Sequence, residues 1–319
     1  MCCRTQSTTI PHYRDEMRLS RNAIIGYPAG IITGVTYGMN PLFAMPLLAA
    51  GVAVQSVLFF RYAIAVILLA LVIAFSRMSF RINLKQAGVL LVLGILYSSS
   101  SLLLFEAYRF IASGLATTLV FLYPVLVALI MVFLGKVPSW PVWLSIAATF
   151  AGVAIMTGGG GDAVSAPTGI WLSVGSALAY ALFIVIVNRS KVIAEISNTV
   201  LTFYSLLVGA VVFMCFSTTS SIGLTEGLNS FDSWMLLLGL AVIPTIVSTT
   251  TLAVATRNIG ATKASVLGVF EPITAIIIGT IAFGEPLTTG IIVGITISII
   301  AVTFMIYTTK PRLFHLRQK

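Results

Sequence analysis

The chain has 319 residues, of which 58% are hydrophobic and only 8% are charged, and its mean hydropathy is +1.06. A soluble domain carries about 25% charged residues, so the composition excludes a soluble globular protein and indicates one that crosses a lipid bilayer several times. The formal net charge of +9 does not indicate nucleic-acid binding, because no basic stripe with interleaved aromatic residues accompanies it.

Ten stretches are apolar enough, and close enough to the roughly 20 residues that a membrane helix needs, to be expected as spans. In chain order they cover residues 23–44, 52–75, 86–106, 113–134, 140–157, 168–188, 197–217, 232–255, 262–283 and 287–308. A glycine-rich loop at 158–167 divides them into two groups, and tails at 1–22 and 309–319 flank them. The predicted fold class is therefore an all-α polytopic membrane protein with ten transmembrane helices.

The positions of lysine and arginine predict how the chain lies in the membrane, because positively charged loops stay in the cytoplasm. With the N-terminus inside, all of these residues except Arg61 and Arg109 fall in cytoplasmic segments. The acidic residues Asp162, Glu226, Asp232 and Glu285 fall in outer segments. Both termini are therefore expected in the cytoplasm.

The two groups of spans are related by an internal repeat. Residues 106–136 align with residues 253–285, so that Arg109 matches Arg257 and Pro124 matches Pro272. The halves, 23–157 and 168–308, contain five helices each. Because five is an odd number, the second half must enter the membrane from the opposite side, which predicts an inverted repeat.

Several motifs resemble a known family when taken in order. They include "TYGMNPLF" in the first span, "FFRYAIA" in the second, "LYPVLVALIMVFLGK" in the fourth and "GVFEPITAIIIGTIAFGEPL" near the end. Together they resemble the EamA-type branch of the drug/metabolite transporter superfamily, although Tyr37 and Lys136 stand where the family often has tryptophan and glutamate. The resemblance implies alternating access around a central cavity, and it suggests the bacterial inner membrane.

Small residues and prolines bear on how the helices pack and bend. A stripe at every fourth position of the first span consists of Gly26, Gly30, Gly34 and Gly38. Such a stripe lets a neighbouring helix approach closely, although contact with cargo is the alternative. The prolines expected to break helices beside the cavity are Pro41, Pro124 and Pro272.

Uncharged polar residues inside the spans are candidates for binding cargo. The hydroxyl candidates are Ser100 and Ser101 in the third span and Ser248 and Thr249 in the eighth. The other candidates are Tyr37, Asn40, Tyr123 and Tyr180. Each has a structural alternative, because serine and threonine bond back to their own helix and a buried tyrosine can find a partner in the core.

Two charged residues inside the spans carry the sharpest hypotheses. Glu271 precedes Pro272, and a lone acid at the centre of a membrane helix is disfavoured by roughly 2.5 to 3.5 kcal/mol on insertion scales. It is either a proton or cargo site or a structural contact. Arg61 either fixes helix packing or meets an anionic part of the cargo, Glu106 or Glu271.

Enzyme functions lack their usual residues. His12 and His315 lie in the tails, and no zinc-protease, phosphate-loop or serine-nucleophile motif occurs, so no catalytic residue, metal or cofactor is predicted. The predicted function is a secondary transporter of small-molecule cargo, an exporter of amino acids or similar metabolites, with protons as one candidate energy source. The alternatives are a membrane protein of the same fold used for regulation or assembly, and a carrier of phosphorylated or sugar-nucleotide cargo.

Overall fold

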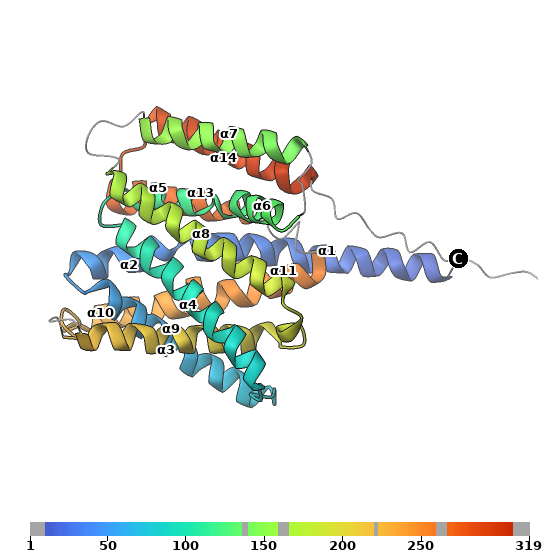
Figure 1. Cartoon of the computed structure of the whole chain (residues 1–319), viewed down its shortest axis with the longest axis horizontal. Helices are drawn as coiled ribbons and strands as arrows, with labels where there is room; N and C mark the ends of the chain where they lie inside the picture. Colours follow the sequence, from blue (N-terminus) through green and yellow to red (C-terminus); the bar gives the residue numbers. More distant parts are fainter. Residues whose placement is uncertain (1–9, 136–139, 159–165, 220–222, 260–266, 309–319) are drawn as a thin grey trace, which may run out of the picture.

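The computed structural model describes residues 10–135, 140–158, 166–219, 223–259 and 267–308 (Figure 1). These residues form helices and their connections and contain no β-strand. The helices of the first half are α1 (Ile10–Gly38), α2 (Asn40–Ala49), α3 (Val54–Phe75), α4 (Leu84–Ala107), α5 (Ser113–Val120), α6 (Tyr123–Phe133) and α7 (Trp140–Gly158). Those of the second half are α8 (Pro167–Arg189), η1 (Lys191–Ile193), α9 (Asn198–Thr219), α10 (Phe231–Ala241), the π-helix η2 (Val242–Val247), α11 (Ser248–Ile259), α13 (Phe270–Phe283) and α14 (Thr289–Thr308).

Six helical stretches of the described residues are long and apolar enough to cross a membrane, namely Ile24–Ala49, Val54–Phe75, Leu84–Ala107, Pro167–Val187, Asn198–Ser217 and Phe231–Leu252. Shorter apolar helices occupy Ser113–Val127, Trp143–Gly152, Phe270–Phe283 and Thr289–Ala301. The all-helical class and six of the predicted spans are therefore confirmed. The four shorter helices lie within the other four predicted ranges.

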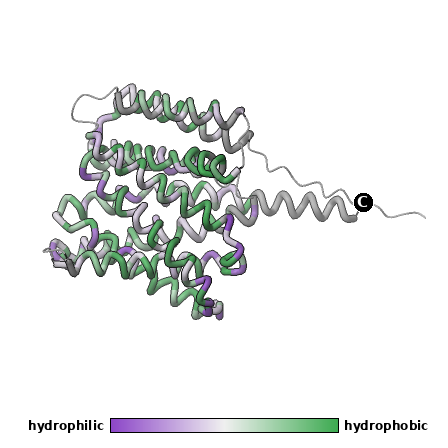
Figure 2. The backbone as a smooth tube through the Cα atoms, in the orientation of Figure 1, coloured by the Kyte–Doolittle hydropathy of each residue, from purple (hydrophilic) through white to green (hydrophobic). Residues whose placement is uncertain are grey.

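The surface of the helices is suited to lipid. Large apolar side chains such as Phe75, Leu84, Phe133 and Ile281 are at least 80% exposed, and Figure 2 shows hydrophobic residues along most of the described helices with hydrophilic ones mainly near their ends. Because lipid tails are as apolar as leucine, such side chains gain nothing by being buried between helices. The interior must therefore be held together by close packing and by hydrogen bonds.

Helices from the two halves are interleaved in space (Figure 1). α1 packs against α11 and α13, α3 against α9, α4 against α8 and α9, and α5 against α13. α7 and α14 pack against each other and form a pair at the edge of the bundle in Figure 1. Neither half therefore forms a core of its own within the described residues.

One end of the bundle, called here the basic end, carries the connections after α3 and α8. Its charged residues include Arg77, Arg81, Lys85, Arg189 and Lys191. The two connections meet there, because the side-chain amide of Gln86 donates to the carbonyl oxygen of Val192. The other end, called the opposite end, carries Arg109, Glu226 and Asp232.

The helices are interrupted beside each of the three predicted prolines. α1 ends at Gly38 and α2 begins at Asn40, just before Pro41. α5 ends at Val120, and Pro124 is the second residue of α6. Pro272 is the third residue of α13, which follows a turn. A proline lacks the N–H of a continuing helix, so it is best tolerated in the first turn, where Pro41, Pro124 and Pro272 lie.

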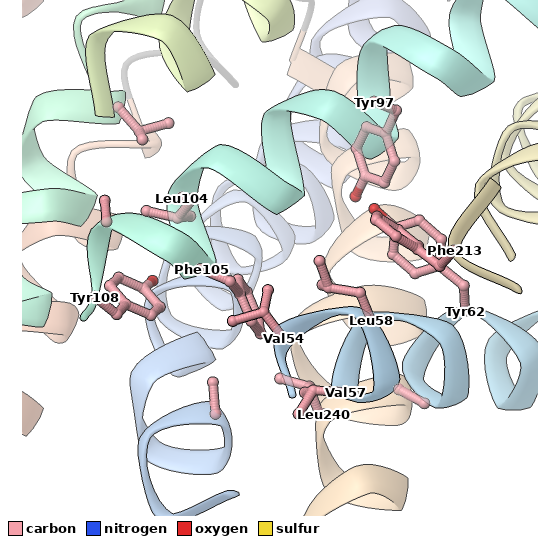
Figure 3. Packing of buried hydrophobic residues seen from close by; sticks show 14 of the residues in the cluster. Val54, Val57, Leu58, Tyr62, Tyr97, Leu104, Phe105, Tyr108, Phe213 and Leu240 are labelled. Carbon is pink, nitrogen blue, oxygen red and sulfur yellow. The ribbon is translucent and has the colours of Figure 1, made fainter. Parts of the chain in front are cut away.

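Packing at the opposite end is dense and apolar. Figure 3 shows side chains of α3, α4 and α10 meeting there, including Val54, Leu58, Phe105 and Leu240, each at most 3% exposed. Tyr62 belongs to the same cluster, and its hydroxyl donates to Ser101 Oγ. The space between these helices is therefore filled by side chains.

The glycine stripe of α1 lies against the start of α13. All four of its glycines are buried. A methyl group on Gly34 would meet the Cβ atom of Phe270, and one on Gly38 would come within 2.5 Å of the carbonyl oxygen of Glu271. The stripe thus brings α1 into backbone contact with the segment that carries Glu271.

Replacing Gly38 with alanine should therefore destabilise the protein. The added methyl group meets backbone atoms that cannot rotate away, and overpacking of this kind costs about 1 to 3 kcal/mol. Gly88→Ala is the matched control, because it adds the same methyl group to an exposed helical glycine with no neighbour within 4 Å. Thermal unfolding in detergent should show a lower midpoint for Gly38→Ala alone, and equal midpoints would contradict the packing.

Candidate functional site

A buried arginine anchors one side of the candidate site. Arg61, on α3, is 2% exposed, and its Nε donates to Oγ1 of Thr245 over 2.9 Å. Its guanidinium carbon lies 5.5 Å from the ring centroid of Phe105 and 6.0 Å from that of Tyr62. Aromatic faces stabilise a cation at such distances.

Thr245, the hydrogen-bond partner of Arg61, is held in position because Pro244 precedes it. Pro244 has no N–H, so the carbonyl oxygen of Leu240 lacks the donor that a regular α-helix would give it. The helix widens into the π-helix η2, and Oγ1 of Thr245 donates to the Leu240 oxygen over 3.0 Å. Thr245 is therefore fixed as an acceptor, and it orients the side chain of Arg61.

No carboxylate in the described part of the chain pairs with Arg61. Glu106, one of the expected partners, instead accepts from Nη1 of Arg109 over 3.0 Å. Among the described residues, none accepts a hydrogen bond from the two terminal nitrogens of Arg61. Its positive charge is therefore held in place by Thr245 and two aromatic rings and is not neutralised by an ion pair.

The opposite charge is provided by Glu271, the second residue of α13. It is 8% exposed, and its backbone N–H donates to the carbonyl oxygen of Gly268. Within the described part of the chain, its carboxylate has neither a hydrogen bond nor an ion pair. An acid in this position is costly unless it meets a proton, water or a cation.

Four tyrosines lie around these charges. The ring centroids of Tyr97 and Tyr180 are 6.4 Å apart, and those of Tyr123 and Tyr180 are 5.0 Å apart in an edge-to-face arrangement. Glu271 lies within electrostatic range of Tyr37, Tyr97, Tyr123 and Tyr180, and Arg61 within range of Tyr37 and Tyr97. We call these four residues the tyrosine cage.

The hydroxyl groups of the cage are available for new contacts. No described residue forms a hydrogen bond with the hydroxyl of Tyr37, Tyr97, Tyr123 or Tyr180. A tyrosine hydroxyl in the interior needs a polar partner, so these four are suited to water or to a polar molecule. Tyr37, Tyr123 and Tyr180 are candidates from the sequence, whereas Tyr97 is not distinguished there from the serines that follow it.

Asn40 lies beside the cage, where α1 ends. Its side-chain nitrogen donates to the carbonyl oxygen of Tyr37 over 2.7 Å. Its Oδ1 atom is buried and has no hydrogen-bond partner. The side-chain nitrogen of Asn40 is thus hydrogen-bonded, while its side-chain oxygen can still accept a hydrogen bond.

The predicted hydroxyl residues divide between structural and available positions. Ser100 bonds with Ser176 of α8, and Ser101 accepts from Tyr62, so both link helices. Thr249 donates to the carbonyl oxygen of Thr245 over 2.8 Å, as threonine commonly does within a helix. Ser248 is 3% exposed, and its hydroxyl has no partner among the described residues.

A second carboxylate links the halves near the opposite end. Glu285, which the sequence places in an outer loop, accepts from the backbone N–H of Ser113 over 2.7 Å, from the Ser113 hydroxyl and from the N–H of Gly114. These groups begin α5, where free N–H groups and the helix dipole favour an anion. The acid is therefore a cap for a helix of the other half.

Glu285→Gln should lower the free energy of unfolding by about 1 to 2 kcal/mol, because an amide has one acceptor oxygen and cannot serve three donors with full charge. Glu226→Gln is the control, since Glu226 accepts one local N–H, from Gly223. Chemical unfolding followed by tryptophan fluorescence would measure both variants. If the two variants lose the same stability, Glu285 does not link the halves.

Comparisons with known proteins agree with this architecture. Two segments of the chain, residues 24–158 and 167–307, match the EamA-like transporter family. No curated protein matches the chain. A solved structure described as "Crystal structure of protein" is similar over 89% of this chain and 96% of its own, with 15% sequence identity and a TM-score of 0.63, which shows a shared fold.

The family match covers most of the chain and includes every residue of the candidate site. The resemblance read from the sequence motifs is therefore confirmed. The matched family comprises membrane transporters and not enzymes, in agreement with the hydropathy of the helices. The chain belongs to the EamA-like transporter family.

Proposed function

We propose that the protein is a secondary carrier that exports amino acids or similar small metabolites. One observation carries this proposal: a buried arginine and a buried glutamate both lie within electrostatic range of Tyr37 and Tyr97, and the described residues include no ion pair between them. A molecule with both a carboxylate and an ammonium group could satisfy Arg61 and Glu271 at once. The free oxygen of Asn40 supports an N–H donor in the cargo.

The same charges argue against the phosphorylated cargo that the sequence left open. A phosphate ester needs several cations, and Glu271 would repel it. Lys263, a second basic residue, which lies at the start of the predicted span 262–283, is outside the described residues.

Transport would use the duplicated architecture. We take residues 23–157 and 168–308 as inverted repeats that rock around the cage, with the helix breaks at Pro41, Pro124 and Pro272 as hinges. The basic end would face the cytoplasm of a bacterial cell, since positive residues gather there. A proton carried by Glu271 is our candidate for energy coupling.

Transport by reconstituted liposomes tests the proposal. Vesicles would be loaded with labelled amino acids, with matched amines that lack the carboxylate, and with matched acids that lack the amine. We expect release of one or more amino acids and much slower release of both matched sets. Folded protein that moves no amino acid in the panel would refute the proposed cargo class.

A further inference from the structure

A second polar site lies about 12 Å from Arg61 along α3, at the 1.5 Å rise of an α-helix. A pocket of about 150 Å³ lies between α3, α9 and α11, toward the basic end. Its lining consists of Leu69, Asn198, Thr199, Thr202, Thr249, Thr250 and Val254. Five of these seven side chains carry a hydroxyl or an amide group.

The lining is unusual for a surface that faces lipid. A threonine in a membrane helix ordinarily bonds back to a carbonyl of its own helix, and Thr249 does so with Thr245. The hydroxyls of Thr199, Thr202 and Thr250 have no such bond and no other partner among the described residues. Unsatisfied polar groups are costly in hydrocarbon, so this pocket is suited to water and to polar solutes.

The pocket is connected to the cage through α11. Thr249, in its wall, donates to the carbonyl oxygen of Thr245, and the side-chain Oγ1 of the same Thr245 accepts from Nε of Arg61. Ser248 lies between these two threonines in the chain and has a free hydroxyl. On α9, the buried Oγ of Ser205 also lacks a partner, one helical turn beyond Thr202. The hydroxyls of Ser248 and Ser205, which have no described partner, therefore lie on the two helices that lead from the pocket toward Arg61.

The corresponding positions in the other half are closed. In the repeat that matches Arg109 with Arg257, Thr202 corresponds to Val54 and Thr249 to Ser101. Val54 is 3% exposed and belongs to the apolar cluster of Figure 3, and Ser101 is bonded to Tyr62. The two halves thus differ at these positions: Val54 is buried among apolar side chains and Ser101 is hydrogen-bonded, while the basic end has a pocket lined by hydroxyls without a described partner.

We infer that this pocket is the portal through which small polar cargo passes between the cage and the aqueous phase at the basic end. The inference rests on the proposed function, because a portal needs a carrier. The cargo it fits is a small molecule with several hydrogen-bonding groups, which Thr199, Thr202 and Thr250 would bind in place of water.

Cysteine labelling tests the portal without requiring a known cargo. Cys2, Cys3 and Cys215 are first replaced by serine, and Thr202→Cys, Thr250→Cys or Leu252→Cys is then introduced. Leu252 is the matched control, because it lies on the same helix as Thr250 and is 37% exposed but does not line the pocket. A membrane-impermeant maleimide is added from the basic end in membrane vesicles.

We expect both threonine positions to react at least about tenfold faster than Leu252→Cys, because a cysteine in contact with water ionises to the thiolate that attacks maleimide. Equal slow labelling at all three positions would mean that lipid fills the pocket, and it would overturn the portal. This outcome does not depend on whether any amino acid is transported.

A second measurement tests whether the pocket leads to the cage. Ser248→Cys reports on the inner position, and Thr202→Trp or Thr250→Trp fills the pocket. Either tryptophan, in protein whose thermal unfolding is unchanged, should slow labelling of Ser248→Cys about tenfold or more and should slow transport in liposomes. Unchanged labelling would overturn the inference. If amino acids are released at the wild-type rate with the pocket filled, the portal fails and the proposed carrier function stands.

Discussion

Glu271→Gln is expected to abolish transport or its dependence on pH while leaving the protein folded. The substitution keeps the size of the side chain and removes its ability to carry a negative charge. Loss of a charged hydrogen bond in a buried site costs about 1.5 to 3 kcal/mol, which is about 10- to 100-fold in binding. If the carboxylate also carries the coupling proton, net export should stop, because an amide cannot exchange that proton.

Glu106→Gln is the matched control for this experiment. Glu106 is also an intramembrane acid, but it is paired with Arg109 near the opposite end. The pH dependence of efflux from liposomes should be lost in Glu271→Gln and kept in Glu106→Gln. If the pH profile of Glu271→Gln is the same as that of the wild type, Glu271 has only a structural role, at the contact between α1 and α13.

Arg61→Gln is expected to have the other large effect. The variant removes a positive charge that no described carboxylate neutralises, and with it the proposed partner of the cargo carboxylate. Transport of amino acids should fall about 10- to 100-fold. Amines without a carboxylate should lose much less, since they do not use this group.

Arg109→Gln serves as the control, because the side chain of Arg109 is 61% exposed and paired with Glu106. Initial rates over a range of amino-acid concentrations would separate weaker binding from slower movement. An equal loss for amino acids and for simple amines would show that Arg61 acts through packing. Thr245→Val adds a further comparison, because it keeps the shape of Thr245 and removes only the acceptor of Arg61.

Much of this architecture can be predicted from the sequence because it follows from local properties. Apolar length gives the spans, proline gives the helix breaks, and a lone Glu271 or Arg61 in an apolar run is conspicuous by its cost. The connection of Arg61 to Thr245 could not be predicted in this way, since it joins residues 184 positions apart. The pair Pro244 and Thr245 within a predicted span does indicate an irregular helix. It does not indicate that Thr245 accepts a hydrogen bond from Arg61.

The contacts of Glu285 are a second example of long-range contacts that could not be predicted from the sequence. Positive-inside topology predicts that Glu285 lies on the side away from the basic residues, yet it treats an acid at a helix end as a loop residue. Its partners on α5 lie 172 positions earlier in the chain and were not distinguished by any local pattern. Contacts between the interleaved halves are therefore what sequence reasoning missed.

In the proposed carrier, the π-helix η2 would allow a change of state by a single residue. A π-turn contains one more residue than an α-turn, so it stores an insertion that can move along a helix. Returning Val242–Val247 to α geometry would rotate α11 by roughly 100°, the angle per residue of an α-helix. Thr245 would then leave Arg61 as Thr249 and Thr250 turned away from α9. In that proposed mechanism, one register shift would release the arginine and close the proposed portal together.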